Sequence, residues 1–310
     1  MSIADELRDF HGRWTAGGQG DNGAKSITKS LQGKRDDDAR GAVNSGKAAD
    51  TQKIHTNAKG EYTPEREALH RAIIQHFMGH SEAQASPQAI FTAGGAASGK
   101  STLAGQKLND DGSKSEANLP VPKGSVYINP DDIKAMLPEY RSLHENGRDD
   151  VAAAATHEES SQIAKALAAV AMANHRHIIV DGTGNSGVGK FGNKIRAALA
   201  AGYKVKARYA HIPVKEAIVR EKKRAIRTGR KVDEKVLRGQ HQTVSKGYAD
   251  DVRHIPGVHV EIYSTLGRGR PTLIADQPAH RPNRVINAKQ YREHLDKATV
   301  STTQPKAMAA

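Results

Sequence analysis

The chain of 310 residues contains no cysteine, and only 4% of its residues are aromatic. Without cysteine the protein can form no disulfide, bind no metal through a thiolate and use no cysteine nucleophile. The few aromatic residues leave little for single-stranded bases to stack on. No apolar run is long enough to span a bilayer, and residues 1–7 do not form a signal peptide. We therefore expect a soluble protein of the cytosol, without a membrane partner.

Apolar residues are also scarce, at 37% of the chain, and the mean hydropathy is −0.65. Both values are low for a compact protein of this length, so we expect part of the chain to lie outside a packed core. Residues 1–62 are rich in Gly, Ser, Asn, Asp and Lys. We predict a mostly disordered arm over residues 1–62, a folded domain over 63–278 and a polar tail with one short helix over 279–310. Alternatively the arm folds onto a partner, with Trp14 as its anchor.

A glycine-rich stretch is the strongest local signal. Gly94, Gly99, Lys100 and Ser101 fill the pattern G-x-x-x-x-G-K-[ST] of a phosphate-binding loop. Glycines let the backbone wrap around a phosphate with its N–H groups pointing inward, while the lysine reaches the β- and γ-phosphates. A short strand over residues 87–93 and a short helix over residues 102–108 supply the context that the motif requires. We predict that the nucleotide is bound by Gly94, Gly95, Ala96, Ala97, Ser98, Gly99, Lys100, Ser101 and Thr102.

Strand and helix patterns alternate after this loop. Thr63, Pro64 and Gly79 are typical of the start and end of a packing helix that precedes it. Further strands are expected over residues 125–129, 177–181, 204–211, 258–263 and 271–275. Further helices are expected over residues 151–174, 192–201, 214–227, 233–248 and 288–296. This alternation predicts an α/β protein of the P-loop type, with a mostly parallel sheet covered by helices on both faces.

Acidic side chains follow two of these strands. Asp131 comes just after the strand at 125–129, and Asp181 ends the strand at 177–181. Ligands of open α/β sheets bind at the carboxyl ends of the strands. An apolar strand that ends in aspartate is where P-loop enzymes hold Mg²⁺. We expect Ser101 and Asp181 to hold Mg²⁺ together with the nucleotide.

The net charge of +13 is concentrated in one part of the chain. Residues 203–253 contain 15 Lys and Arg against 6 Asp and Glu, which gives +9 of the total. Such a segment can bind nucleic acid, but clustered arginines also serve phosphoryl transfer. The charge alone does not decide between these functions.

Five motifs in this order resemble the zeta-toxin kinases of toxin–antitoxin systems, over about residues 71–274. The shared stretches are Gly94-Gly95-Ala96-Ala97-Ser98-Gly99-Lys100-Ser101-Thr102, Ile128-Asn129-Pro130-Asp131-Asp132-Ile133-Lys134, His157-Glu158-Glu159-Ser160-Ser161, Val180-Asp181-Gly182-Thr183-Gly184 and Gly229-Arg230-Lys231-Val232. The first is common to many nucleotide enzymes, whereas the order and spacing of all five are far more specific. The resemblance implies a kinase that uses ATP or GTP with Mg²⁺ to phosphorylate a nucleotide sugar, UDP-N-acetylglucosamine in the best-known members.

The resemblance also implies roles for single residues. Asp131 resembles the catalytic carboxylate that accepts the hydroxyl proton, and a shift of one residue would transfer this role to Asp132. Arg224 and Arg230 resemble the arginines that bridge donor and acceptor phosphates, and they are expected to act together with Lys100. Arg220 and Arg227 lie one turn from Arg224 on the same predicted helix, so the choice among these three arginines stays open. By analogy, Glu158 or Glu159 and Thr183 contact the sugar nucleotide. The simpler explanations are that one of the aspartates caps the following helix and that the glutamates and Arg224 lie on solvated helix faces.

Alternative functions and partners stay open at the level of sequence. The acceptor could be another nucleotide or a nucleic-acid 5′ end. The basic segment could instead mark a nucleic-acid-associated ATPase or binding module, and a virion-associated accessory protein is a third reading. Binding alone would not require Asp131 and Asp181, so we favour the kinase. If it is a toxin, a small helical antitoxin or the arm before Thr63, acting in cis, is expected to restrain it.

Overall fold

The computed structural model describes residues 49–79, 81–108, 114–116, 119–228, 232–267 and 270–299. The chain divides into two compact units. The first contains the described parts of Met1–Ala85, Lys123–Ile178 and Arg224–Lys231, and the second those of Ser86–Pro122, Ile179–Lys223 and Val232–Ala310. Among the described helices, none combines the length and apolar character needed to cross a bilayer.

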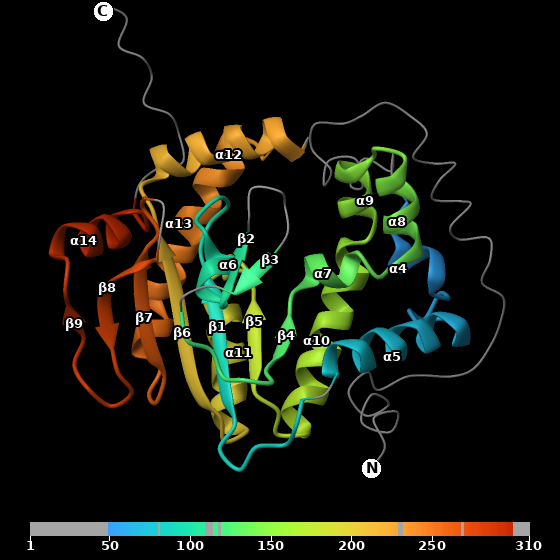
Figure 1. The fold of residues 1–310 in the computed structure, drawn as a ribbon, viewed down its shortest axis with the longest axis horizontal. Coiled ribbons are helices and arrows are strands. Elements are labelled where there is room, and N and C mark those ends of the chain that lie inside the picture. Colours follow the sequence, from blue (N-terminus) through green and yellow to red (C-terminus); the bar gives the residue numbers. More distant parts are fainter. Residues whose placement is uncertain are drawn as a thin grey trace, which may run out of the picture. The chain divides into compact units, whose positions relative to one another are not determined.

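One large sheet organises the fold, in the strand order β4-β5-β1-β6-β7-β8-β9 (Figure 1). Its strands are β1 (Gln88–Ala93), β4 (Val126–Ile128), β5 (Ile178–Asp181), β6 (Lys204–His211), β7 (His259–Ser264), β8 (Thr272–Gln277) and β9 (Arg284–Val285). The β1–β6 and β6–β7 pairs are parallel, whereas β7–β8 and β8–β9 are antiparallel. The predicted α/β fold with a mostly parallel sheet is therefore confirmed, and the antiparallel strands stand at one edge.

The second unit contains α6 (Lys100–Leu103), α11 (Lys190–Ala200), the start of α12 (Val214–Thr228), α13 (Glu234–Asp250), the short 3₁₀ helix η1 (Val252–His254) and α14 (Ala288–Asp296). The helix expected over residues 102–108 is wrong in its second half. Helix α6 ends at Leu103, and Gly105 adopts a left-handed φ of 83°. The chain then forms β2 (Gln106–Leu108), which pairs with β3 (Lys114–Glu116). Glycine stops the helix because it alone enters this backbone region without cost.

A buried arginine fixes the segment that follows α6. Arg208 of β6 is 2% exposed and donates from Nε to Glu261 Oε2 at 3.0 Å. It also donates from Nη1 to the Leu103 carbonyl at 2.9 Å and from Nη2 to the Pro120 carbonyl at 2.7 Å. Three charge-assisted hydrogen bonds satisfy the buried guanidinium and hold the end of α6 against the sheet.

The first unit is largely helical apart from β4. It contains α4 (Thr51–His55), α5 (Pro64–Met78), α7 (Pro130–Lys134), α8 (Pro138–Glu145), α9 (Asp149–Ala155) and α10 (His157–Ala173). The single helix expected over residues 151–174 is two helices. Thr156 separates them: it is fully buried, and its hydroxyl donates to the Ala152 carbonyl at 2.7 Å. A threonine that bonds back to the preceding turn offers the backbone an alternative to continuing the helix.

The sequence predicts that folded structure begins at Thr63, but in the structure it begins earlier. Asp50 caps α4 by accepting from the Gln52 N–H at 2.9 Å, and Thr51 donates to the Ala155 carbonyl at 3.2 Å. Tyr62 is 4% exposed and donates to Gln162 Oε1 at 2.8 Å. The end of the predicted arm is therefore part of the first unit. Residues 1–48, which carry the rest of that prediction and Trp14, lie outside the described residues.

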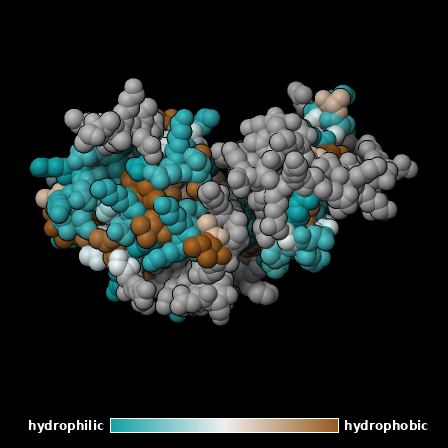
Figure 2. Space-filling view, turned by 90° about the horizontal axis from the view of Figure 1, so that it is seen from above, coloured by the Kyte–Doolittle hydropathy of each residue, from teal (hydrophilic) through white to brown (hydrophobic). Residues whose placement is uncertain are grey.

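The molecular face seen from above in Figure 2 is mostly hydrophilic where it is coloured, with apolar residues in smaller patches. The large exposed apolar side chains include Val219, Ile226 and Leu266, and Ile226 is 89% exposed. Isolated apolar residues on a surface are ordinary in a protein of this composition.

Candidate active site

The phosphate loop of the second unit, residues 94–101, has the backbone that its sequence predicts. Gly99 has a φ of 78° and caps α6, and Ala97 has a φ of 57°. Left-handed residues at positions 97 and 99 curve the backbone into the concave shape of an anion nest, and the Ser98 N–H closes the turn by donating to the Gly95 carbonyl at 3.2 Å. This conformation costs alanine free energy, because its Cβ crowds the backbone. It persists only where contacts with neighbouring residues impose it.

Two glycines of the loop are required by close packing. A Cβ at Gly94 would lie 2.4 Å from Ser98 Oγ and 2.9 Å from Ala210 Cβ. A Cβ at Gly95 would lie 2.3 Å from Cδ2 of His241. Neither glycine has a positive φ, so space and not backbone conformation demands glycine at both positions.

Neighbouring segments hold the loop from both sides. The Gly94 N–H donates to the Thr183 carbonyl at 3.0 Å. The Thr265 hydroxyl donates to the Ser98 carbonyl at 2.6 Å, and the Thr265 methyl group lies beside Gly99. The loop is therefore anchored by the segments after β5 and after β7.

The polar side chains of the loop lie in different environments. Lys100 donates from Nζ to the Gly95 carbonyl at 3.4 Å, so its ammonium folds back over the loop. Ser98 is fully buried, and within the described residues its hydroxyl has no hydrogen-bond partner. A buried hydroxyl without a partner costs stability, which is expected where a ligand completes the site. Ser101, the residue predicted to bind Mg²⁺, is half-buried at the start of α6.

Asp181 ends β5 as predicted and is held by the neighbouring strand β1. The Thr92 hydroxyl donates to Asp181 Oδ1 at 2.9 Å, and Asp181 is 7% exposed. The contacts Thr92–Asp181 and Gly94–Thr183 follow each other in the same direction along both segments. The two strands therefore end at the same edge of the sheet, where the phosphate loop and the carboxylate lie side by side.

Asp131 lies in the first unit and is open to solvent. The residue that caps α7 is Asn129, whose Oδ1 accepts from the Asp131 N–H at 2.9 Å. The expectation that Asp131 or Asp132 caps this helix is therefore wrong. The Asp131 side chain is 60% exposed, and its Oδ1 lies 2.9 Å from Nζ of Lys134, which is 7% exposed. Its carboxylate is thus presented at the surface, beside one buried cation.

The two adjacent glutamates of α10 lie in different environments. Glu158 is exposed, whereas Glu159 is fully buried. Arg66 donates from Nε to Glu159 Oε1 at 2.6 Å and from Nη2 to Oε2 at 2.8 Å, and His70 Nε2 lies 2.7 Å from Oε1. The expectation of an exposed helix face fits Glu158 but not Glu159. The Glu159 carboxylate is occupied by the protein's own cation.

The same arginine binds a second carboxylate. Nη1 and Nη2 of Arg66 donate to the two oxygens of Glu139, both at 2.9 Å, and His55 Nε2 lies 2.7 Å from Glu139 Oε1. Burial by itself raises the pKa of Glu159, but the hydrogen bonds from Arg66 and His70 outweigh it and hold the pKa well below its usual range. This buried charge network, Arg66–Glu139–Glu159 with His55 and His70, therefore contains ionised carboxylates at neutral pH.

Of the two arginines implied by the resemblance, Arg224 is among the residues that the structure describes. Arg224 is half-buried on α12 and falls in the first unit. Arg230 lies outside the described residues. Arg220, one turn before Arg224, belongs to the second unit and donates from Nη2 to the Thr265 carbonyl at 2.6 Å. Arg220 thus supports the segment that holds the phosphate loop.

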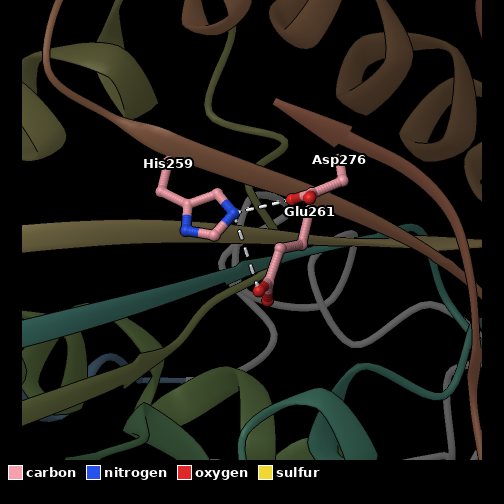
Figure 3. A group of neighbouring side chains, drawn as sticks. All are labelled: His259, Glu261 and Asp276. Atoms are coloured by element: carbon pink, nitrogen blue, oxygen red, sulfur yellow. Dashed lines mark hydrogen bonds and ion pairs between the residues drawn. The ribbon is translucent and has the colours of Figure 1, made fainter. Parts of the chain in front are cut away.

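A further cluster of charged side chains joins β7 and β8 (Figure 3). His259 Nε2 lies 2.7 Å from Asp276 Oδ1 and 3.8 Å from Glu261 Oε1, so three metal-ligand atoms gather within 4.8 Å. Glu261 also pairs with Lys206 Nζ at 2.8 Å and with Arg208. Two cations already neutralise this carboxylate. His259 also begins its strand, at the sheet edge opposite the phosphate loop, so we interpret the cluster as a structural charge network.

Sequence reasoning missed two residues that contact the phosphate loop. Gln240 and His241 of α13 both bond to the backbone of Ala96, about 145 positions earlier in the chain. No spacing or motif marks them, because this contact exists only after the second unit has folded.

Two solved structures of one complex share this architecture. The AvrRxo1-ORF1:AvrRxo1-ORF2 complex with ATP has a TM-score of 0.60 at 18% identity, over 80% of this chain and 77% of that chain. The native complex gives 0.57 at 18% identity, over 79% and 76%. A structure of the PezAT chromosomal toxin–antitoxin system of Streptococcus pneumoniae gives 0.44 at 17% identity, over 66% of this chain and 79% of that chain. No curated protein matches the chain.

The AvrRxo1 similarities show a shared fold, because their sequence identity is low. A match to the sequence pattern of a family shows, in addition, which family the chain belongs to. The pattern that describes the zeta toxins matches residues 74–287, which is more than half of the chain and includes the phosphate loop, Asp131 and Asp181. The protein belongs to the zeta toxin family.

Proposed function

We propose that the protein is a kinase that transfers the γ-phosphate of ATP or GTP to a sugar hydroxyl of a nucleotide sugar. The observation that carries the proposal is the phosphate loop, in which Ala97 and Gly99 are left-handed and the buried Ser98 hydroxyl has no hydrogen-bond partner among the described residues. Zeta toxins are kinase-like phosphotransferases, which supports phosphoryl transfer over simple binding. One structure of similar fold contains ATP.

The donor half of the site lies in the second unit. Residues 94–102 would form the loop around the phosphates. The N–H groups of Gly94 and Ala96 bond to Thr183 and Gln240, so N–H groups later in the loop would face the phosphates. The Lys100 side chain would swing away from the Gly95 carbonyl to reach the β- and γ-phosphates. The hydroxyl of Ser101 and the carboxylate of Asp181 are hard oxygen ligands of the kind that Mg²⁺ takes together with phosphate oxygens. Bound there, the ion would neutralise charge that develops on the transferred group.

The acceptor half would be built around Asp131. Asn129, and not Asp131, caps α7, and the exposed Asp131 carboxylate lies 2.9 Å from the Lys134 ammonium. It would accept the proton of the attacking hydroxyl as the new oxygen–phosphorus bond forms and the bond from the γ-phosphorus to the bridging oxygen breaks, which releases ADP or GDP. Arg224 and Arg230 would bring positive charge to the moving phosphoryl group, an effect worth about 10³–10⁵ in rate where an arginine finger operates.

The environments of the candidate residues support a choice among the proposed nucleotide-sugar contacts. Glu158 and Thr183 are exposed and can accept or donate to a sugar, UDP-N-acetylglucosamine being the reference substrate. Glu159 is bound to Arg66 and His70. We propose that Glu159 contributes by holding α10 in place, so that Glu158 is the glutamate that contacts the substrate.

An assay for ATP consumption over a panel of nucleotide sugars tests the proposal, with Lys100→Ala as the blank. We expect one member of the panel to stimulate ATP turnover by the wild type and none to stimulate the variant. Stimulation by a nucleic-acid 5′ end or another nucleotide, and by no nucleotide sugar, would assign a different acceptor. Equal turnover by wild type and Lys100→Ala would refute the kinase.

As a zeta toxin in a cell, the protein would need restraint, and we propose a small helical antitoxin or the N-terminal arm as the partner. Residues 49–62 are packed against α10 and must stay. The informative truncation therefore removes residues 2–48 only. Higher ATP affinity or toxicity after this truncation supports inhibition in cis, and unchanged values point to a separate antitoxin.

A further inference from the structure

Two side chains of helix α13 bond to the backbone of one residue of the phosphate loop, Ala96, at both its N–H and its carbonyl. The Ala96 N–H donates to Gln240 Oε1 at 3.1 Å, and the Ala96 carbonyl lies 3.0 Å from His241 Nε2. The Ala96 methyl group packs in a buried cluster with Ile212, Ala217, Ile218 and Leu237. Ala96 is therefore fixed in position and in the orientation of both adjoining peptide planes.

The chemistry of His241 permits only one arrangement of this contact. The side chain is 2% exposed, and burial together with the nearby charge of Lys297 lowers its pKa to about 4, so the ring is neutral at physiological pH. A carbonyl only accepts, so Nε2 carries the proton and donates it to the Ala96 oxygen. The ring also fills the space above Gly95, where a Cβ would collide with it.

The position of Ala96 decides what the next residue can do. Ala97 adopts a left-handed φ of 57°, which costs a non-glycine residue free energy and persists only where neighbours impose it. The peptide plane before Ala97 is set by the Ala96 carbonyl, which His241 holds, and the plane after it by the Ser98 N–H, which donates to the Gly95 carbonyl at 3.2 Å. The Ala96 N–H itself is turned toward Gln240, so the nest is left to the N–H groups that follow it.

We propose that Gln240 and His241 are positioning residues for phosphate binding: they hold Ala96 so that Ala97 stays left-handed and the loop is shaped before the nucleotide arrives. This inference rests on the proposed nucleotide binding and assigns new residues to it. Preorganisation of this kind lowers the ordering cost of binding, so its loss weakens affinity for the phosphates that the loop surrounds.

The test measures equilibrium binding of MgATP and of AMP, which lacks the β- and γ-phosphates. Gln240→Met keeps the length of the side chain and removes the acceptor, whereas Gln240→Glu keeps an acceptor oxygen. We expect Gln240→Met to weaken ATP binding about 3- to 10-fold, the effect of one hydrogen bond, and AMP binding less than about twofold. Gln240→Glu should restore most of the ATP affinity.

Gln242→Met is the matched control, because Gln242 lies on the same helix, is half-buried and donates to the Ala298 carbonyl away from the loop. It should leave both affinities within about twofold. His241→Gln, which can still donate to the Ala96 carbonyl, should bind ATP better than His241→Leu.

A second measurement tests the backbone argument directly. Glycine adopts a left-handed φ without cost, so in an Ala97→Gly background the Gln240→Met change should weaken ATP binding less than in the wild type. If Gln240→Met binds ATP as the wild type does, or weakens ATP and AMP equally, the inference is wrong while the proposed function stands. If the wild type binds neither nucleotide, both fall.

Discussion

The buried charge network of the first unit allows one prediction to be worked out in full. Arg66 makes four hydrogen bonds to two carboxylates, at 2.6 to 2.9 Å, and the side chains of Glu139 and Glu159 are 2% and 0% exposed. Arg66→Met keeps much of the side-chain volume but leaves both carboxylates buried beside histidines only. Removing one partner of a buried ion pair costs about 3–5 kcal/mol, and we expect Arg66→Met to fall at or above that range at pH 7.

The pH dependence separates this cause from a packing defect. In the wild type the folded pKa of Glu159 is lowered, so its stabilisation is present above its unfolded pKa and is lost as the pH falls through the folded pKa. Without Arg66, burial would raise the folded pKa values of the carboxyls above their unfolded values. Their penalty then grows with rising pH and disappears in acid. The difference in stability between wild type and variant should therefore shrink below about pH 5.

Urea unfolding at pH 7 and at about pH 4 measures both effects. Arg71→Met is the matched control, because Arg71 lies on the same helix, its side chain is 39% exposed and its nearest carboxylate oxygen, on Glu67, is 3.8 Å away. We expect the control to change stability by less than about 0.5 kcal/mol. An Arg66→Met variant within about 1 kcal/mol of wild type at pH 7, or a loss that does not depend on pH, would refute the reasoning.

Three further predictions concern the candidate active site. Asp131→Asn should lower kcat about 10²- to 10⁴-fold with little change in ATP affinity; near-normal turnover, combined with an inactive Asp132→Asn, would move the base by one residue. Gly95→Ala should weaken MgATP binding in a titration, because the added Cβ would lie 2.3 Å from the His241 ring. Unchanged affinity would show that His241 can move aside without disturbing the loop. Thr92→Val should lower kcat by removing the hydrogen bond that orients Asp181, and extra Mg²⁺ should recover part of the loss if that residue binds the ion.

Much of the fold followed from local patterns in the sequence. The phosphate loop is defined by spacing, and β6 over Lys204–His211 and α14 over Ala288–Asp296 have the predicted bounds. The departures also have local causes that are hard to weigh in advance. Thr156 breaks one helix through a hydrogen bond to its own preceding turn, and Gly105 ends α6 early.

Contacts between distant residues could not be predicted. The environment of Glu159 is set by Arg66, 93 positions away, and nothing in the sequence around Glu158 and Glu159 distinguishes the exposed glutamate from the buried one. The same holds for His241 and Ala96, which are 145 positions apart. Periodicity predicts which face of a helix is buried, but not which charged groups meet inside the fold.

Phosphorus NMR of a reaction that contains MgATP and a nucleotide sugar tests the central claim most directly. The account predicts that the γ-phosphate signal of ATP decreases while a sugar phosphomonoester appears with the wild type, and that Lys100→Ala and Asp131→Asn form it far more slowly. Release of free phosphate alone, or formation of the same phosphomonoester by both variants at the wild-type rate, would contradict it.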